Sequence, residues 1–244
     1  MKRLSRNDIE MIGERVLNSY RKLPEVRDKQ LYRIDPEILV EKVLGLNLDY
    51  RHLSLDGSVL GLTSFKEIGV EIFDFTDEEC FYFLDGKTVL VERELKTDVT
   101  RRGRCNFTTA HEAAHQIFKM LFPKEYGAAA EGQPLHFYKA QSETRKPITN
   151  WEEWQANTLA AALLLPRDLV DYAMYLFSLP EKIKVLNKIY TPRVYEQFAG
   201  MAEFLGVSKT ALAIRMKQLG RLEKEYLHNP YEFMSIEYEG GNMQ

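Results

Sequence analysis

The spacing of apolar residues predicts helices first and then a small sheet. Apolar side chains recur every three or four residues over Asn7–Tyr20 and Pro36–Leu44, which predicts two amphipathic helices, and Pro36 suits a first helical turn. Short apolar or alternating segments follow, and the turn pairs Asp56-Gly57 and Asp85-Gly86 separate several of them. The predicted strands are Leu48–Arg51, Val59–Leu62, Gly69–Phe73, Phe81–Leu84 and Thr88–Val91. We expect them to form a small, mostly antiparallel sheet.

The second half of the chain predicts mainly helices, interrupted by one long irregular interval. The first helix covers Thr109–Phe122 and ends at Pro123. Residues 124–149 lack a clear period, and a loop of that length usually borders a functional site. Further helices are predicted from Thr149 or Asn150 to Leu165 and over Arg167–Phe177, Glu181–Ile189, Pro192–Leu205 and Lys209 to about Leu227. The expected fold class is therefore α+β, mainly helical.

Composition and charge narrow the class of protein. A chain of 244 residues with 45% hydrophobic residues can bury a substantial core, and a net charge of −3 disfavours nucleic acid as the default partner. The N-terminus mixes charges from the start and lacks the apolar stretch of a signal peptide. The longest apolar run, Leu159–Leu165, is too short to cross a bilayer. Cys80 and Cys105 do not suggest a disulfide framework. We expect a soluble cytoplasmic protein with no membrane association.

The motif His111-Glu112-Ala113-Ala114-His115 lies within one of the predicted helices. Residues four apart share a helix face, so the two imidazoles can reach one metal ion. Glu112 is rotated away from that face and can act as a general base towards a metal-activated water. A structural interpretation of Glu112 also exists, because Thr109 and Glu112 have the spacing of a capping box.

Catalytic zinc generally takes three protein ligands, so a third must come from another segment. The longer motif with a third histidine fails, because Leu121 stands where that histidine is expected. The remaining candidates are His52, His136, His228, Glu152 and Glu153. One face of the predicted helix from residue 150 carries Glu153, Ala156, Asn157, Ala160 and Leu164. Small residues there permit close packing on the motif helix, which favours Glu153 as the ligand, with His136 as its main competitor.

Two separated motifs then show a specific resemblance. The segment from Asn106 to His115, followed by Glu153-Trp154-Gln155-Ala156-Asn157 and by 160–166, resembles the ImmA/IrrE family of metallo-endopeptidases. The likeness covers roughly residues 30–220, although Ala114 and Asn106 stand where family members often carry glycine and arginine. The resemblance implies that His111, His115 and Glu153 bind Zn²⁺ and that Glu112 is the catalytic base. It also implies a helix-turn-helix transcriptional repressor as substrate, in a phage, mobile-element or stress-response setting.

The resemblance also suggests an organisation of the chain. We expect a helical extension over 1–29, a zincin-like metallopeptidase domain over 30–180, a helical region over 181–228 packed on that domain, and a loose tail over 229–244.

Peptide hydrolysis by such a site needs a second group to stabilise the oxyanion. The candidates by chemistry are His136, Tyr138, Arg145, Tyr172 and Tyr175. Asn157, one turn after Glu153, is placed to hydrogen-bond a metal ligand. Cys105 is expected to be a small buried side chain outside the site.

The two helices separated by Gly206-Val207-Ser208 resemble a DNA-reading helix-turn-helix. Its candidate phosphate contacts are Lys209, Arg215, Lys217 and Arg221. Without a basic excess around them, these cations are more typical of a solvated helix face, so DNA binding is disfavoured. The leading hypothesis is a zinc endopeptidase, and the alternative is a regulatory protein that keeps the metal site but binds a repressor or DNA without proteolysis.

Overall fold

The computed structural model describes residues 3–74, 76, 78–125, 135–139 and 151–232, and these form an α+β fold that is mainly helical. The helical segments are α1 (Arg6–Tyr20), α2 (Pro36–Ile38), the π-helical turn η1 (Leu39–Val43), α3 (Arg93–Thr97), the 3-10 turn η2 (Val99–Arg101), α4 (Arg102–Leu121), α6 (Trp151–Leu164), α7 (Arg167–Leu176), α8 (Pro192–Leu205) and α9 (Lys209–Gln218). The strands are β1 (Asn47–Arg51), β2 (Val59–Ser64), β3 (Glu67–Phe73), β4 (Glu79–Asp85), β5 (Thr88–Glu92), β6 (Leu135–Lys139), β7 (Ile183–Leu186) and β8 (Leu222–Glu225).

The predicted single sheet is divided in two. Four strands pair in the order β1-β5-β2-β6, with β1 parallel to β5 and β2 antiparallel to both of its neighbours. The strands β3 and β4 form a separate antiparallel hairpin. Strand β6 lies inside the interval that was predicted to be a loop, so that prediction is wrong for residues 135–139. The strand exists because it pairs with β2, a contact distant in sequence that no local pattern reveals.

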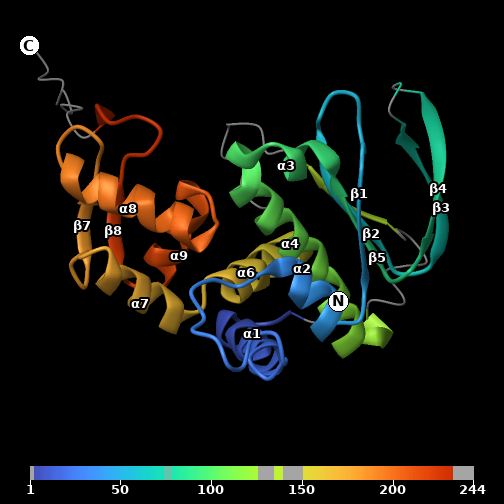
Figure 1. Ribbon diagram of the computed structural model, residues 1–244, viewed down its shortest axis with the longest axis horizontal. Helices are drawn as coiled ribbons and strands as arrows, with labels where there is room; N and C mark the ends of the chain where they lie inside the picture. The colour runs from blue at the N-terminus through green and yellow to red at the C-terminus, as the bar shows by residue number, and fades with distance from the viewer. Residues whose placement is uncertain (1–2, 75, 77, 126–134, 140–150, 233–244) are drawn as a thin grey trace, which may run out of the picture.

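The sheet is the middle of three layers, with α4 on one face and the β3–β4 hairpin on the other (Figure 1). Side chains alternate between the two faces of a strand. Leu60, Val89 and Val91 accordingly belong to the same buried cluster as the α4 residues, whereas Leu62 and Leu90 pack with the hairpin.

The motif helix is longer than predicted, because α4 begins at Arg102 instead of Thr109. Thr109 is therefore in the middle of the helix, where its hydroxyl donates to the Cys105 carbonyl at 3.0 Å. The capping-box interpretation of Thr109 and Glu112 is wrong for this reason, and Glu112 has no capping role. Cys105 is buried, as expected.

Helix α6 lies directly against α4, and small side chains allow the two backbones to approach closely. Ala113 and Ala114 of α4 and Ala156 of α6 are completely buried in the same core cluster. Helix α1 packs on the other side of α6, where a Cβ on Gly13 would lie 3.3 Å from the Cβ of Ala162. Because α4 and α1 pack on two sides of α6, most of α6 is buried. The same packing fixes the position of its first turn.

The C-terminal lobe contains α7, α8, α9 and a two-stranded parallel sheet of β7 and β8 (Figure 1). Two helix predictions are wrong here. The segment Glu181–Ile189 contains the strand β7, and the helix predicted from Lys209 to about Leu227 ends at Gln218. Gly220 has a φ of +73°, a left-handed conformation that favours glycine and stops the helix, after which β8 pairs with β7.

Two arginines of α9 and the turn after it form ion pairs within the protein. Arg215 is fully buried; its Nε donates to the Leu165 carbonyl at 2.9 Å, and its guanidinium forms a bidentate ion pair with Glu10 of α1. Arg221 makes a bidentate pair with Asp171. Arg215 therefore links α9 to α1 and to Leu165 at the end of α6, and its interpretation as a phosphate contact is wrong.

Several expectations fall on segments outside the described residues. These are the helix cap at Thr149 or Asn150, most of the interval 124–149, and the tail from residue 233 onward. Among the described helices, none has the length and apolar character needed to cross a membrane.

Candidate metal centre

The His111, His115 and Glu153 side chains converge where α4 packs on α6. His111 Nε2 lies 3.3 Å from Glu153 Oε2, and His115 Nε2 lies 3.4 Å from Glu153 Oε1. The two Nε2 atoms are 3.1 Å apart. The helical spacing predicted the histidine pair, and the packing of the first turn of α6 on α4 adds the carboxylate. The group can hold a metal ion.

The burial of this group is uneven. The side chains of His111 and His115 are 1% and 0% exposed, whereas that of Glu153 is 28% exposed. Solvent therefore reaches the group on the side of Glu153. A metal ion held there would have two ligands fixed in the core and one facing the outside, from which a substrate can approach.

The electrostatics favour the protonation states that a metal requires. Burial lowers the pKa of His111 to about 4. Burial alone would raise the pKa of Glu153, but the hydrogen bonds and charges of His111 and His115 outweigh it and lower that pKa below its ordinary value. At neutral pH the group therefore contains a neutral His111 and an ionised Glu153, which are the forms that bind metals.

Asn157 orients the His111 ring from the second turn of α6. Its Oδ1 lies 3.2 Å from His111 Nδ1. A neutral imidazole with its proton on Nδ1 donates that hydrogen bond and keeps the lone pair of Nε2 available as a metal ligand. Asn157 therefore contacts His111, one of the candidate ligands, and its role behind a bound metal stays a prediction.

Glu112 is completely buried beside the metal group. Neither of its carboxylate oxygens has a hydrogen-bond partner in the described part of the chain. Its pKa is raised well above the ordinary value, mainly by burial and further by the negative charge of Glu153. An unpartnered buried carboxyl is costly to the fold, so its retention suggests a chemical role.

Gly61 of β2 makes room for Glu112, and sequence reasoning did not identify it. A Cβ at position 61 would lie 2.8 Å from Glu112 Oε1 and 2.6 Å from Thr108 Cγ2, closer than real Cβ atoms approach. A glycine inside a strand is the usual sign of such a close approach, and this was the available signal.

Replacing Gly61 with alanine is expected to displace the Glu112 carboxylate without touching a candidate ligand. Because a misplacement of about 1 Å can cost about 100-fold in rate, we expect any reaction that depends on Glu112 to slow by about that factor while metal content is unchanged. Rates and metal analysis on Gly61→Ala and on Gly61→Ala/Thr108→Ser test this. The second variant relieves the Thr108 contact, so a persisting defect assigns the effect to Glu112, and an unaltered rate in both would contradict it.

Tyr138, on the edge strand β6, is the oxyanion candidate whose side chain lies against the site. Its ring centroid is 4.2 Å from that of His111. Burial, followed by the charges of Glu112 and Glu153, raises the Tyr138 pKa to about 12, so its hydroxyl remains a proton donor at neutral pH.

The other oxyanion candidates do not join the site in the described structure. The Tyr172 hydroxyl accepts a hydrogen bond from Gln30 at 3.1 Å, and Tyr175 is 79% exposed on α7. The backbone of His136 pairs with Thr63, but its side chain is outside what the structure describes, and so is Arg145.

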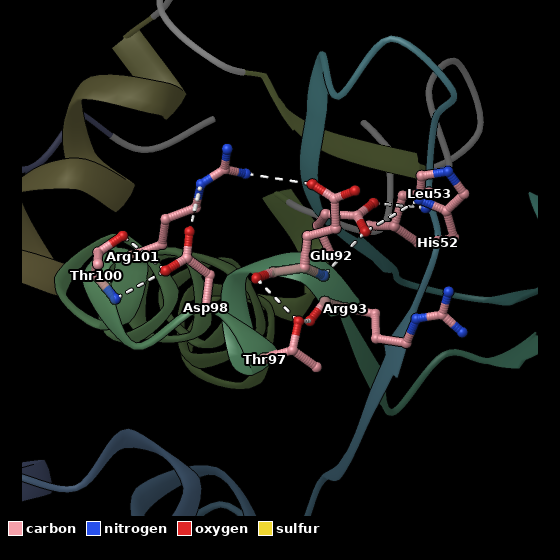
Figure 2. A network of polar contacts seen from close by, with 9 residues as sticks. His52, Leu53, Glu92, Arg93, Thr97, Asp98, Thr100 and Arg101 are labelled. Carbon is pink, nitrogen blue, oxygen red and sulfur yellow. Dashed lines mark hydrogen bonds and ion pairs between the residues drawn. The ribbon is translucent and has the colours of Figure 1, made fainter.

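The remaining ligand candidates also have other places. His52 Nδ1 lies 3.1 Å from the buried carboxylate of Glu92, which also accepts the Leu53 backbone N–H at 2.7 Å, as Figure 2 shows. His228 is exposed beyond β8. Glu152 lies outside the three-residue group, although it is close enough for its charge to interact with His115.

A scan against protein-family models and a search of curated proteins found no match to this chain.

Proposed function

We propose that this chain is a zinc-dependent endopeptidase of the ImmA/IrrE type. The observation that carries the proposal is the convergence of His111, His115 and Glu153 beside the buried Glu112. Ligand atoms of a tetrahedral zinc ion lie about 3.3 Å apart, because each is about 2.0–2.1 Å from the metal. The separations of 3.1, 3.3 and 3.4 Å among the three side chains fit that geometry. Two imidazoles and one carboxylate are also a usual ligand set of catalytic zinc.

Each side chain around the metal group has its own role in the proposed hydrolysis. Zinc bound there supplies Lewis acidity, which polarises a carbonyl and lowers the pKa of water towards about 7. Glu112 accepts the proton of the attacking water, and its raised pKa lets it hold that proton until it passes to the leaving amine. Asn157 keeps the His111 ring in position. Tyr138 donates its hydroxyl proton in a hydrogen bond to the developing oxyanion.

Tyr138→Phe is expected to lower kcat by about 10- to 100-fold with little change in KM. The hydroxyl acts on charge that develops only in the transition state, whereas the phenylalanine ring preserves the contact with His111. Steady-state kinetics with metal analysis measures this. A normal kcat at full metal occupancy would exclude Tyr138 from the chemistry.

The proposed substrate is a helix-turn-helix transcriptional repressor, which the resemblance implies. The test is to mix the purified chain with the helix-turn-helix repressor encoded nearest to its gene. We expect the repressor to be cut, cutting to stop on chelation, and zinc to restore it, with fragments followed by mass spectrometry. Cleavage that persists after complete metal removal would contradict the proposal, because no other described group replaces the metal's role.

The alternative is a regulatory protein that keeps the metal site and binds a repressor or DNA without proteolysis. Direct DNA binding through α9 is disfavoured, because Arg215 is buried and Lys217 and Arg221 are paired with acidic residues of the same chain. Repressor binding without cleavage in the same experiment would favour the alternative.

A further inference from the structure

The outer face of the β3–β4 hairpin exposes two large aromatic side chains. Phe81 and Phe83 of β4 are 81% and 73% exposed. They alternate with Cys80, Tyr82 and Leu84, which point towards the protein, so both phenylalanines stand on the outer face. Leu84 anchors the inner face in a buried cluster with Val70 and Ile72 of β3. The hairpin is thus packed on the protein through one side and exposes two aromatic side chains on the other.

This face is also strongly acidic. From residue 67 to residue 85 the chain has seven acidic residues and no lysine or arginine, and Lys66 and Lys87 lie just outside this range. Four of the seven, Glu67, Glu71, Glu79 and Asp85, occupy exposed positions of the two strands. The strand register places Glu71 opposite Phe81 and Glu67 opposite Asp85. None of the ion pairs among the described residues includes Glu67, Glu71 or Glu79.

Figure 1 shows the hairpin as the outermost layer, on the opposite side of the sheet from α4. No described element lies over its outer face in that view. We define the docking face as the outward side chains of the two strands: Glu67, Glu71, Glu79, Phe81, Phe83 and Asp85.

We infer that the docking face binds the cationic, DNA-binding surface of the protein substrate, apart from the site that cuts it. The identity of the partner rests on the proposed function. A protein that binds DNA phosphates presents lysine and arginine, and an acidic surface is complementary to them. Two exposed aromatics provide the apolar anchors that interfaces commonly use.

Charge also argues against other occupants. A second copy of this chain would bring two acidic faces together, and like charges in an interface are unfavourable. An anionic lipid surface would be repelled for the same reason. A basic protein partner satisfies both the aromatic pair and the surrounding carboxylates.

The test compares a folded repressor with a peptide. The double variant Phe81→Thr/Phe83→Thr removes the aromatic anchors, while threonine suits a strand and both positions are exposed. The variant is assayed with two substrates. One is the full-length repressor encoded nearest to the gene of this chain, and the other is a short peptide that spans the cleavage site of that repressor. We expect KM for the repressor to rise at least about 10-fold with kcat unchanged, and the peptide kinetics to be unchanged. Tyr231→Thr, at an aromatic position that is 66% exposed, is the matched control with no effect.

The acidic residues of the docking face are tested separately, by repressor binding. Glu67→Lys/Glu71→Lys is expected to weaken repressor binding by a similar factor, and higher salt should weaken wild-type binding but not peptide cleavage. Binding is measured by fluorescence anisotropy on a Glu112→Gln background, which is independent of turnover.

The outcomes separate this inference from the proposed function. Normal repressor cleavage by the hairpin variants overturns the docking face and leaves the peptidase intact. Binding that needs the hairpin, without any cleavage by the active chain, supports the docking face and contradicts the peptidase. If the repressor is neither bound nor cleaved, both the docking face and the peptidase are contradicted. A wild-type dimer that Phe81→Thr/Phe83→Thr converts to monomer, seen by analytical ultracentrifugation, overturns the inference in favour of a second copy.

Discussion

Glu112→Gln is expected to abolish peptide hydrolysis while zinc stays bound. The amide has nearly the shape of the carboxylate but cannot accept the proton of the attacking water, so we expect the rate to fall by about 1,000-fold or more. Metal content should be unchanged, because Glu112 is not one of the three converging side chains. Turnover of the repressor and zinc analysis on the same preparation measure both. Unchanged cleavage by this variant would remove the basis of the proposed mechanism.

The same substitution is expected to stabilise the metal-free protein. The folded-state pKa of Glu112 is raised above the ordinary value of 4.5, so between these two pKa values the folded state keeps a proton that the unfolded state releases. The stability of the wild type therefore falls as pH rises through that window, and a residue that does not titrate escapes the loss. A gain of about 1 kcal/mol would raise Tm by about 2–4 °C in a chain of this size.

Calorimetry of metal-free wild type and Glu112→Gln at pH 5 and pH 7 tests how the stability difference between them changes with pH. The advantage of Glu112→Gln should be larger at pH 7. A smaller or reversed advantage there would show that Glu112 is not held in an unfavourable site.

Glu153→Ala is expected to lose zinc and activity together. Removing the carboxylate leaves only the two imidazoles as protein ligands. Loss of a residue that hydrogen-bonds a metal ligand typically lowers metal affinity by about 10- to 100-fold, and we expect the loss of a ligand itself to lower it further. Asn157→Ala, which removes only the partner of His111, provides that smaller effect for comparison. Competitive chelator titration measures both affinities.

The matched control for this prediction is Glu152→Ala. It deletes the neighbouring carboxylate in the same helical turn, and that residue is outside the metal-capable group. It should keep stoichiometric zinc. Full zinc retention by Glu153→Ala would instead reject Glu153 as the third ligand and return attention to His136.

Local periodicity accounts for the parts of the fold that the sequence predicted well. The helix containing His111 and His115 and the strands around Leu90 follow from apolar spacing, because that spacing reflects which side of an element is buried. The same method failed for Glu181–Ile189, where a four-residue strand depends on β8, about forty residues later. Gly220 carried a signal for the end of α9, but the apolar and charged residues on both sides of it suggested a continuous helix.

The candidate site divides in the same way. The spacing of His111, Glu112 and His115 alone establishes that two imidazoles share a helix face with a carboxyl beside them, because the helical repeat acts over four residues. Tertiary packing alone decides that Glu153, about forty residues away, reaches them, and that Glu112 is buried without a partner against Gly61. Burial and distances between segments depend on how elements pack, and a one-dimensional pattern contains that information only indirectly. Arg215 is the clearest case, since its place in a helix suggested a surface cation, whereas the packing of α1 and α9 against α6 brings it to Glu10 as a buried ion pair.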